Sequence, residues 1–460
     1  MTDLFGTIES LSAAYSNHQI KPSKVVDAHL QAIEKHNPKL GAYQTVFFEQ
    51  AMQAAEAADK AFASGYRIGP FHGVPFALKD IYDLEGQICT NGSMALKDRV
   101  SSKSGTVVRR LIAAGGIVLG KSKTVESAFG GWGTNQKMGT PWNPWDLKNH
   151  RIPGGSSSGS GVATAAGLAV CGIGSDTGGS VRLPAAYCGI SGLKVTEGQL
   201  PCDGIAPLAQ TLDTPGPMAQ TVIDTVILYE IMLGREGGAI DSDMQTGNGL
   251  YHMMHKGVRG LKLGQMNQAE RDNCSTDILA GYDQAIDALK RLGADIDVFS
   301  SPFEYASLAD DNGAITAVEA YNNHGHLYED NAAPMDEDVR KRMLTGKTYL
   351  AHDYVRMLET RRQRCDEFNQ SIKGFDAILT PSTTSTAPII SDVDQAISPG
   401  HFTRPFNYLA MCGLSVPTGL ASDNMPHSLQ IIARAHDEAM AIRIGAAIES
   451  VTPSIGRASL

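Results

Sequence analysis

Apolar residues repeat at helical spacing in the first part of the chain. They predict a helix that begins at Pro22 and ends before Pro38, because proline suits the first turn of a helix and disrupts its interior. Stretches over 51–63 and 107–114 predict two more helices, each followed by a stop that contains glycine. The continuous apolar residues 117–119 predict a short buried strand.

Glycine, serine and small apolar residues dominate residues 150–200, where we expect a tightly packed helix over 160–168 and a buried strand over 169–173. Helical and extended patterns alternate over the rest of the chain, and residues 304–372 are mostly helical in pattern. The remaining expected elements are helices over 218–233, 276–292 and 438–448 and strands over 261–265, 294–298, 377–380, 414–418 and 428–432. This alternation predicts one large α/β domain over residues 1–460, with helices on both faces of a sheet.

Composition and charge narrow the range of partners and locations. The 460-residue chain carries 39 basic and 49 acidic side chains, for a net charge of −10. This balance argues against nucleic acid as a partner, although a local basic patch stays open. The start of the chain has no basic segment followed by an apolar one, and no apolar run reaches the roughly 18 residues that span a bilayer. Seven cysteines without C-x-x-C spacing are typical of reduced thiols, so we expect a cytoplasmic protein with no membrane partner.

Several short motifs match those of other enzyme classes, but in the wrong context. Residues 115–122 fit the phosphate-binding loop pattern, yet their apolar interior favours a strand, so we expect no nucleotide cofactor. Residues 155–159 fit the nucleophile-elbow pattern without the strand that must precede it, and residues 191–194 match an S-x-x-K motif whose companion motifs are incomplete. His324 and His326 would point to different sides of a helix, so we expect no metal. A Ser-His-Asp triad stays open, because any of the 13 histidines could serve.

Three other segments form a more specific constellation. Residues 73–80 are an apolar, strand-like run that would bury a lysine, residues 153–161 are rich in glycine and serine, and residues 174–185 place two glycines directly before a serine. A serine hydroxyl is a weak nucleophile until a base removes its proton. A lysine serves as that base only when neutral, and burial favours the neutral form. Glycines before the nucleophile let backbone N–H groups converge on one point, as an oxyanion hole requires.

Together with residues 143–146, 192–194 and 212–218, these segments resemble the amidase-signature family along almost the whole chain, most strongly over about 70–220. The resemblance implies a single large domain with a central, mixed, twisted β-sheet covered by helices on both faces. It also implies hydrolysis of the C–N bond of a carboxylic amide, with a small-molecule amide as the substrate and no cofactor.

The resemblance also implies catalytic roles. It assigns Lys79 as the base, Ser156 as a bridging serine and Ser180, 24 residues later, as the nucleophile that forms an acyl-enzyme. It implies a cis peptide bond between Gly155 and Ser156. The backbone N–H groups that it implies for the oxyanion hole are those of Thr177, Gly178, Gly179 and Ser180.

Further residues are candidates for support and for the substrate pocket. We expect Ser157 to hydrogen-bond in support of the triad, and Asp176 either to orient the glycine loop or to cap it locally. Arg182 meets either a substrate carboxylate or an internal acid, and we favour the internal ion pair. An ordinary glycine-rich loop is the alternative for four residues that the resemblance places beside the acyl pocket: Phe129, Gly130, Gly131 and Trp132.

Several alternatives stay open. We expect the helical region 304–372 to form pocket walls, but the amide that fits them is not specified. The nearest alternative is the amidase subunit of a tRNA-dependent amidotransferase, in which Pro-Thr-Tyr-Gly-Arg typically follows Gly-Leu-Lys. Here residues 195–199 read Val-Thr-Glu-Gly-Gln, which favours a free-standing amidase. A partner-dependent hydrolase of small urea-like amides stays open, as does a homodimer. A non-catalytic binding protein is least favoured, because all three triad residues are present.

Overall fold

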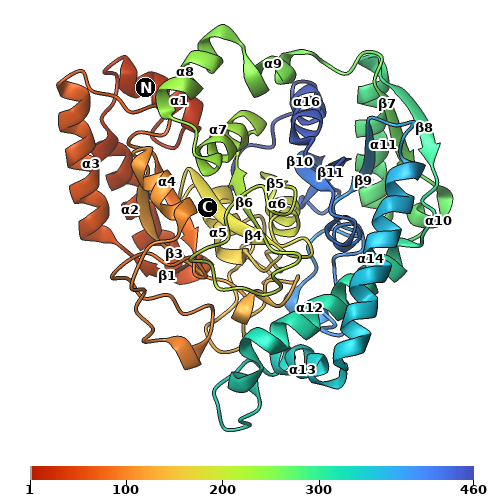
Figure 1. Ribbon diagram of the computed structural model, residues 1–460. Coiled ribbons are helices and arrows are strands. Elements are labelled where there is room, and N and C mark those ends of the chain that lie inside the picture. The colour runs from red at the N-terminus through yellow and green to blue at the C-terminus, as the bar shows by residue number, and fades with distance from the viewer. Residues whose placement is uncertain (1–2) are drawn as a thin grey trace.

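One mixed β-sheet runs through the centre of the molecule (Figure 1). The computed structural model describes residues 3–460, and within them the sheet has 11 strands. Their spatial order is β1 (Tyr43–Val46), β3 (Ile117–Ser122), β2 (Pro75–Lys79), β4 (Cys171–Asp176), β6 (Thr214–Ala219), β5 (Ser191–Lys194), β10 (Cys412–Leu420), β11 (Pro426–Ala433), β9 (Ala377–Pro381), β7 (Lys262–Met266) and β8 (Asp295–Phe299). Strands β2, β3 and β4 run parallel on one side of the sheet, and β7, β8 and β9 on the other. The other neighbours pair antiparallel, so the predicted mixed sheet is confirmed.

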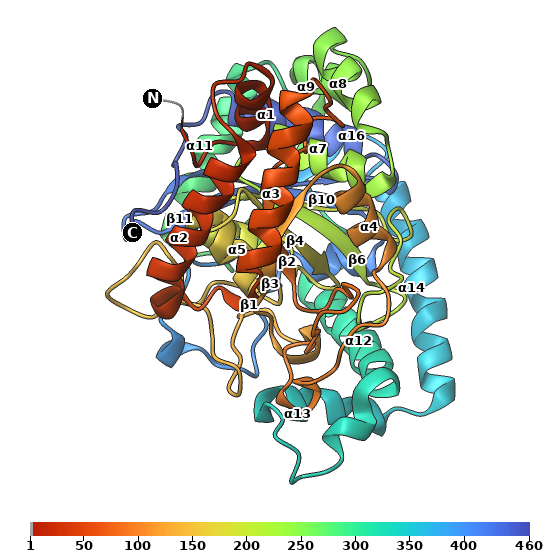
Figure 2. The same ribbon diagram turned by 90° about the vertical axis from the view of Figure 1, so that its left-hand side faces the viewer.

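Helices cover both faces of this sheet, as predicted. They are α1 (Ile8–Ser16), α2 (Pro22–Leu40), α3 (Phe48–Ala63), α4 (Thr106–Ala113), α5 (Ser158–Ala165), α6 (Arg182–Cys188), α7 (Val222–Leu233), α8 (Gly237–Thr246), α9 (Gly249–His255), α10 (Gln268–Arg271), α11 (Thr276–Arg291), α12 (Tyr305–Tyr328), α13 (Glu337–Thr345), α14 (Ala351–Ser371), α15 (Arg404–Tyr408) and α16 (Glu438–Glu449). Helices α7 and α16 pack on one face, and α5 and α6 on the other (Figure 1). Figure 2 shows α2 and α3 side by side over the edge that β1 and β3 form. Within residues 3–460, no helix is both long and apolar enough to cross a membrane.

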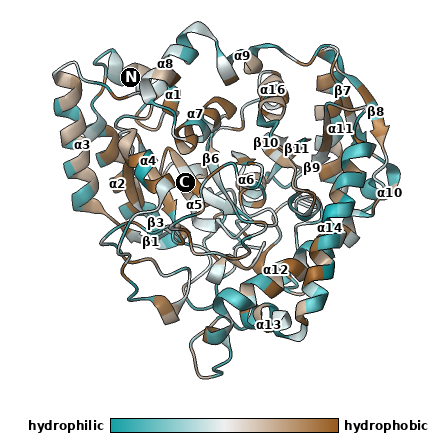
Figure 3. Cartoon of the chain, in the orientation of Figure 1, coloured by the Kyte–Doolittle hydropathy of each residue, from teal (hydrophilic) through white to brown (hydrophobic). Residues whose placement is uncertain are grey.

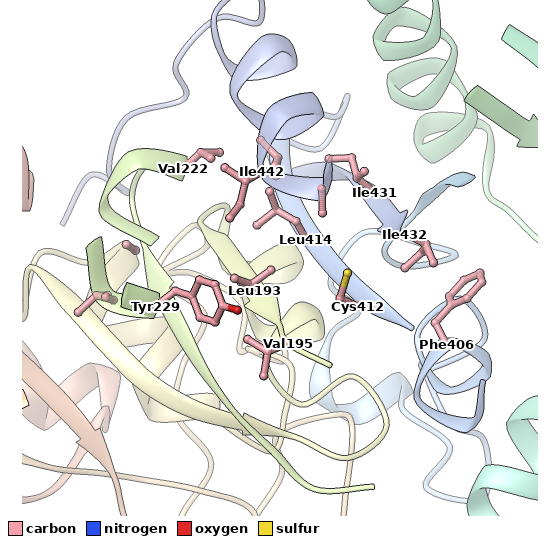
Figure 4. Packing of buried hydrophobic residues seen from close by; sticks show 14 of the residues in the cluster. Leu193, Val195, Val222, Tyr229, Phe406, Cys412, Leu414, Ile431, Ile432 and Ile442 are labelled. Carbon is pink, nitrogen blue, oxygen red and sulfur yellow. The ribbon is translucent and has the colours of Figure 1, made fainter. Parts of the chain in front are cut away.

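The core has a separate apolar cluster on each face of the sheet. Leu193 and Leu414 belong to one cluster with Ile442 of α16 (Figure 4). The successive β2 residues Phe76 and Ala77 fall into different clusters, because side chains alternate between the faces of a strand. Figure 3 shows the hydrophobic residues concentrated in the central strands, whereas α13 and α14 are largely hydrophilic. The large buried core therefore fixes the strands, and the site is built at their ends.

The predicted helix from Pro22 ends later than expected. Helix α2 continues through Pro38 to Leu40 and ends where Gly41 adopts a left-handed conformation, with φ of 59°. Pro38 lies in the last turn, where its missing N–H removes a single helical hydrogen bond close to the end. Proline therefore weakens this terminus without ending the helix.

The predicted helix over 218–233 was wrong at its start. Its first residues belong to strand β6, which lies between β4 and β5, and the helix begins only at Val222. Pro215 and Pro217 concealed this strand, because proline lacks the N–H that a central strand normally donates to its neighbour. The mostly helical character predicted over 304–372 is confirmed by α12, α13 and α14.

The fold brings two of the three sequence segments together at the carboxyl ends of parallel strands. Lys79 is the last residue of β2, and Ser175 lies near the end of the neighbouring β4. Helix α5 follows Ser157 directly and packs against both strands. A Cβ atom at Gly174 would lie 2.6 Å from the Ser157 Oγ. The glycine therefore permits the close approach of helix and strand.

Candidate active site

Lys79 lies at the centre of a buried hydrogen-bonded group. Its side chain has no exposed surface, and its Nζ lies 2.8 Å from the Oγ of Ser156 and 2.8 Å from the Oγ of Ser175. The contact with Ser156 joins two residues that lie 77 positions apart in the sequence. Ser175 was not among the predicted site residues. Its place at the end of the Gly-Ser-Asp strand, one residue before Asp176, is the signal by which the sequence marks it.

Burial changes the chemistry of Lys79. Removal of the ammonium group from water lowers the pKa of Lys79 to about 7, and the negative charges of Asp213 and Asp176 oppose part of this shift. A substantial fraction of this lysine is therefore neutral near pH 7. A neutral amine can accept a proton from the Ser156 hydroxyl, which a permanently charged ammonium cannot do.

Hydrogen bonds to its backbone carbonyl hold Ser156 in place. The Gly155–Ser156 peptide bond is cis, as the family resemblance implies. The Ser156 carbonyl accepts hydrogen bonds from the Thr124 Oγ1 at 2.9 Å and from the Val125 N–H at 3.3 Å. A Cβ atom at Gly155 would lie 2.6 Å from the Gly133 nitrogen, so only glycine fits before this serine.

Ser180 stands in the turn between β4 and α6 and is 8% exposed. Its carbonyl accepts a hydrogen bond from the Ser157 N–H at 3.3 Å. In residues 3–460, the hydroxyl groups of Ser156 and Ser180 form no hydrogen bond with each other. The structure thus joins Lys79 to Ser156 and leaves the Ser180 hydroxyl available to a neighbouring cavity.

Ser157 supports this arrangement, and the hydrogen bonds expected of it are present. Its Oγ accepts from the Ser175 N–H at 3.2 Å and lies 3.3 Å from the Ser175 carbonyl, to which it donates. The start of α5 is therefore tied to the end of β4. This tie holds Ser175 within reach of Lys79.

Asp176 organises the loop that carries Ser180. Its carboxylate accepts hydrogen bonds from the Gly179 N–H at 2.7 Å and the Val181 N–H at 3.1 Å, and it forms an ion pair with Arg182 at 3.0 Å. Both charged side chains are fully buried. Burial alone would raise the pKa of Asp176, but the Arg182 guanidinium and the Asn407 amide hold that pKa well below its usual value. The internal ion pair favoured for Arg182 is confirmed, and Asp176 orients the glycine loop.

The backbone N–H groups predicted for the oxyanion hole are not equivalent. The N–H of Gly179 donates to Asp176, so it is not directed at a substrate. The N–H groups of Thr177, Gly178 and Ser180 have no acceptor among residues 3–460. These three groups are therefore the ones available to stabilise an oxyanion.

Asp213 is a further buried acid beside the loop. It accepts a hydrogen bond from the Thr177 Oγ1 at 2.5 Å and two more from the backbone N–H groups of Leu208 and Ala209. Burial raises the pKa of Asp213 to about 6, although these hydrogen bonds oppose the shift. The sequence contained Asp213 only as part of the segment over 212–218, without a role of its own.

Ser180 opens into a small cavity of about 30 Å³. Phe129, Gly130 and Gly131 line it together with the loop at 177–180, so three of the four predicted pocket residues lie beside Ser180. Trp132 lines only the adjoining outer cavity, where its Nε1 donates to the Ile397 carbonyl at 2.7 Å. Helix α12 contributes to both cavities and α13 to the outer one, which fits a role for the helical region in the pocket walls.

The short motifs that match other enzyme classes have structural roles in this fold. Lys121 of the 115–122 segment is fully buried in β3 and pairs with Asp80 at 3.4 Å, so no phosphate loop exists there. Residues 191–194 form the central strand β5. The His324 Nε2 lies 2.6 Å from the Pro207 carbonyl. Within residues 3–460, no three His, Cys, Asp or Glu side chains are grouped so as to hold a metal ion.

Comparison with known sequences identifies the family to which this chain is similar. A family model described as Amidase matches residues 24–442. A glutamyl-tRNA(Gln) amidotransferase subunit of Granulibacter bethesdensis is 33% identical over an alignment of 493 residues, which covers 100% of this chain and 98% of the relative. The 2-amino-5-chloromuconic acid deaminase of Comamonas testosteroni is 32% identical over 449 residues, covering 96% of this chain and 95% of the relative.

Solved structures of other proteins have the same fold as this chain. One belongs to a vestigial protein complex that reveals the evolutionary origins of an s-triazine catabolic enzyme. It superimposes with a TM-score of 0.89 at 27% identity and covers 99% of this chain and 100% of that one. The native peptide amidase of Stenotrophomonas maltophilia superimposes with a TM-score of 0.82 at 26% identity and covers 97% and 96% of the two chains.

Proposed function

Because this chain belongs to the amidase family, we propose that it hydrolyses a carboxylic amide through an acyl-enzyme intermediate on Ser180. One observation carries the proposal: the 2.8 Å contact between the Lys79 Nζ and the Ser156 Oγ, fully buried beside the loop of Ser180. It supplies a base with a lowered pKa and a hydroxyl through which that base can act.

The first half of the reaction forms the ester. Neutral Lys79 takes the proton of Ser156 while Ser156 takes the proton of Ser180, and the Ser180 Oγ attacks the amide carbon. The carbonyl oxygen becomes an oxyanion, and the N–H groups of Thr177, Gly178 and Ser180 stabilise it. The C–N bond then breaks, and the proton returns from Lys79 through Ser156 to the leaving nitrogen. Ammonia or an amine departs, and the acyl group stays on Ser180.

The second half of the reaction repeats these proton transfers with water. Water donates a proton to Ser156, which passes its own proton to Lys79, and the resulting hydroxide attacks the ester carbon. The bond between the acyl carbon and the Ser180 Oγ breaks, and Ser180 recovers a proton through Ser156. The carboxylic acid leaves and the enzyme returns to its starting state.

The amidotransferase subunit is the second candidate, because relatives with that name align with the whole chain. The segment 195–199 departs from the pattern typical of that subunit. In this segment the Glu197 carboxylate pairs with Arg361 of α14 at 2.6 Å. This departure supports a free-standing hydrolase.

The test is release of ammonia from a panel of aliphatic, aryl, carbamate and amino-acid amides by the purified chain alone. Ser180→Ala is the control, because it removes the nucleophile and leaves the buried frame intact. We expect turnover of at least one amide by the wild type and none by the variant. Hydrolysis only of glutamine, and only once a partner protein is added, would favour the amidotransferase interpretation instead.

A further inference from the structure

Arg404 brings a positive charge to the wall of the Ser180 cavity. It is the first residue of α15 and lines both the inner cavity of Ser180 and the outer cavity. Its side chain is partly buried. Among residues 3–460, no carboxylate lies within ion-pair distance of its guanidinium, in contrast to the fully paired Arg182. A guanidinium that lines a cavity without an acid partner has its N–H donors available for an anion from solution.

Arg342 places a second guanidinium nearby. Its Nε donates to the Phe129 carbonyl at 3.0 Å, and it too has no carboxylate at ion-pair distance within the described residues. Burial, together with the positive charge of Arg342, lowers the pKa of Arg404 to about 10, so Arg404 remains charged at neutral pH. Asp310 and Asp338 line the outer cavity, and their charges partly offset those of Arg404 and Arg342, but among residues 3–460 neither carboxylate lies at ion-pair distance from these arginines.

The Arg404 side chain runs along the loop that precedes the nucleophile. A Cβ atom at Gly178 would lie 3.1 Å from the Arg404 Cγ and 3.6 Å from its Nε. On the other side, a Cβ atom at Gly313 of α12 would lie 3.4 Å from the Arg404 Nη1. The two glycines therefore leave room for this guanidinium directly beside the N–H groups proposed for the oxyanion. An anion bound by Arg404 would therefore lie in the same cavity as Ser180.

We propose that the substrate of this site is a short amide that also carries a carboxylate, and that Arg404 binds this carboxylate. The proposal rests on the proposed amidase activity of Ser180 and narrows its substrate class. The planar guanidinium matches a carboxylate with two parallel N–H donors, which fixes the orientation of the substrate as well as its charge. Arg342 adds a second positive charge and holds the Phe129 loop. The inner cavity is narrow, at about 30 Å³, and adjoins the outer cavity of about 560 Å³; Arg404 lines both, so it can meet a substrate whose amide reaches Ser180.

Kinetics with matched substrates test this assignment. Succinamate carries the carboxylate on the acyl side, N-acetylglycine carries it on the leaving group, and 4-oxopentanamide is a neutral analogue of succinamate of similar shape. We expect the wild type to prefer one of the two carboxylates over the neutral amide by about 100-fold in kcat/KM. Arg404→Gln should abolish this preference while changing kcat/KM for 4-oxopentanamide by less than about threefold, and Arg404→Lys should retain part of it. Lys60→Gln, at an exposed position of α3 that lines neither cavity, removes one positive charge and should leave the preference intact.

Binding to a catalytically dead protein separates this proposal from the proposed function. Calorimetry with Ser180→Ala should detect binding of one of the two carboxylated amides, and adding Arg404→Gln should weaken that binding about 100-fold. If the wild type hydrolyses the neutral amide as well as both carboxylates, and Arg404→Gln changes neither turnover nor binding, the carboxylate proposal is overturned while the amidase proposal stands. If Ser180→Ala still hydrolyses amides, the nucleophile assignment fails, and the binding result alone decides the role of Arg404.

Discussion

The Lys79 Nζ lies 2.8 Å from the Ser156 Oγ, and neither side chain reaches solvent. The apolar strand β2 carries the lysine, and the glycine-rich segment before α5 carries the serine. Across residues 3–460, no carboxylate lies within ion-pair distance of the Lys79 amine. Such a buried lysine is unusual, because burial penalises its charge. Its environment suits a group that must lose and regain a proton.

Replacement of Lys79 by methionine removes the base while filling most of the space. We expect Lys79→Met to fold and to lose about 10⁴-fold or more in kcat/KM, since members of a catalytic triad act as a unit. Steady-state kinetics together with circular dichroism checks both expectations. Lys60→Met, at an exposed position of α3, is the matched control and should keep wild-type activity. Equal activity in the two variants would exclude Lys79 as the base.

The lowered pKa of Lys79 also predicts how stability depends on pH. The folded pKa of about 7 lies below the ordinary value of 10.5, so between these pH values the unfolded chain binds more protons than the folded chain. Stability therefore gains from this residue as pH rises from about 7 to 10.5. Urea denaturation of the wild type and of Lys79→Met across this pH range measures how much Lys79 contributes to the free energy of unfolding. A stability difference that does not change with pH would mean that Lys79 titrates normally.

Much of the proposed triad could be placed from the sequence, because the resemblance to the amidase-signature family rests on short, distinctive segments. The apolar run over 73–80 required its lysine to be buried, and the glycines at 178–179 required a sharp turn before the nucleophile. The hydrogen-bonding state of Gly179 was not predictable, since its N–H donates to Asp176 only once the loop has folded. Strand β6 was missed because its two prolines contradict the usual strand pattern.

Residues that reach the site from distant parts of the chain could not be predicted from the sequence. Arg404 reaches the site from a helix that begins 224 positions after Ser180, and nothing beside it in the sequence signals a cavity. Arg342 likewise meets Phe129 across 213 positions. Local patterns report helices, strands and turns, whereas these pairings depend on how the helices pack around the sheet.

Removal of the bridging hydroxyl should slow the reaction without unfolding the protein. We expect Ser156→Ala to lower kcat by about 10²–10⁴-fold, because general-base catalysis contributes a factor of this size. The loss should be smaller than that of Ser180→Ala, since a water can occupy the place of the missing hydroxyl. Single-turnover kinetics on the two variants gives the comparison. Wild-type kcat in Ser156→Ala would exclude the serine from proton transfer.

The buried pair of Asp176 and Arg182 should contribute strongly to the stability of the fold. Arg182→Ala leaves a buried carboxylate without its partner, which typically costs about 3–5 kcal/mol of unfolding free energy. Arg271→Ala breaks a pair with Asp283 whose side chains are 25% and 50% exposed, and it should cost less than about 1 kcal/mol. Chemical denaturation of both variants makes the comparison. Similar stability losses would show that the Asp176 pair contributes no more than a surface contact.

Capture of the acyl-enzyme tests the central proposal most directly. A slowly deacylating aryl ester or amide, quenched in acid after partial turnover, should leave a covalent adduct on the intact chain, and peptide mass spectrometry should place the adduct on Ser180. The increase in the mass of the chain should equal the mass of the acyl group minus one hydrogen. Ser180→Ala should carry no adduct. An adduct on a different residue, or turnover without any adduct and with full activity in Ser180→Ala, would contradict the account.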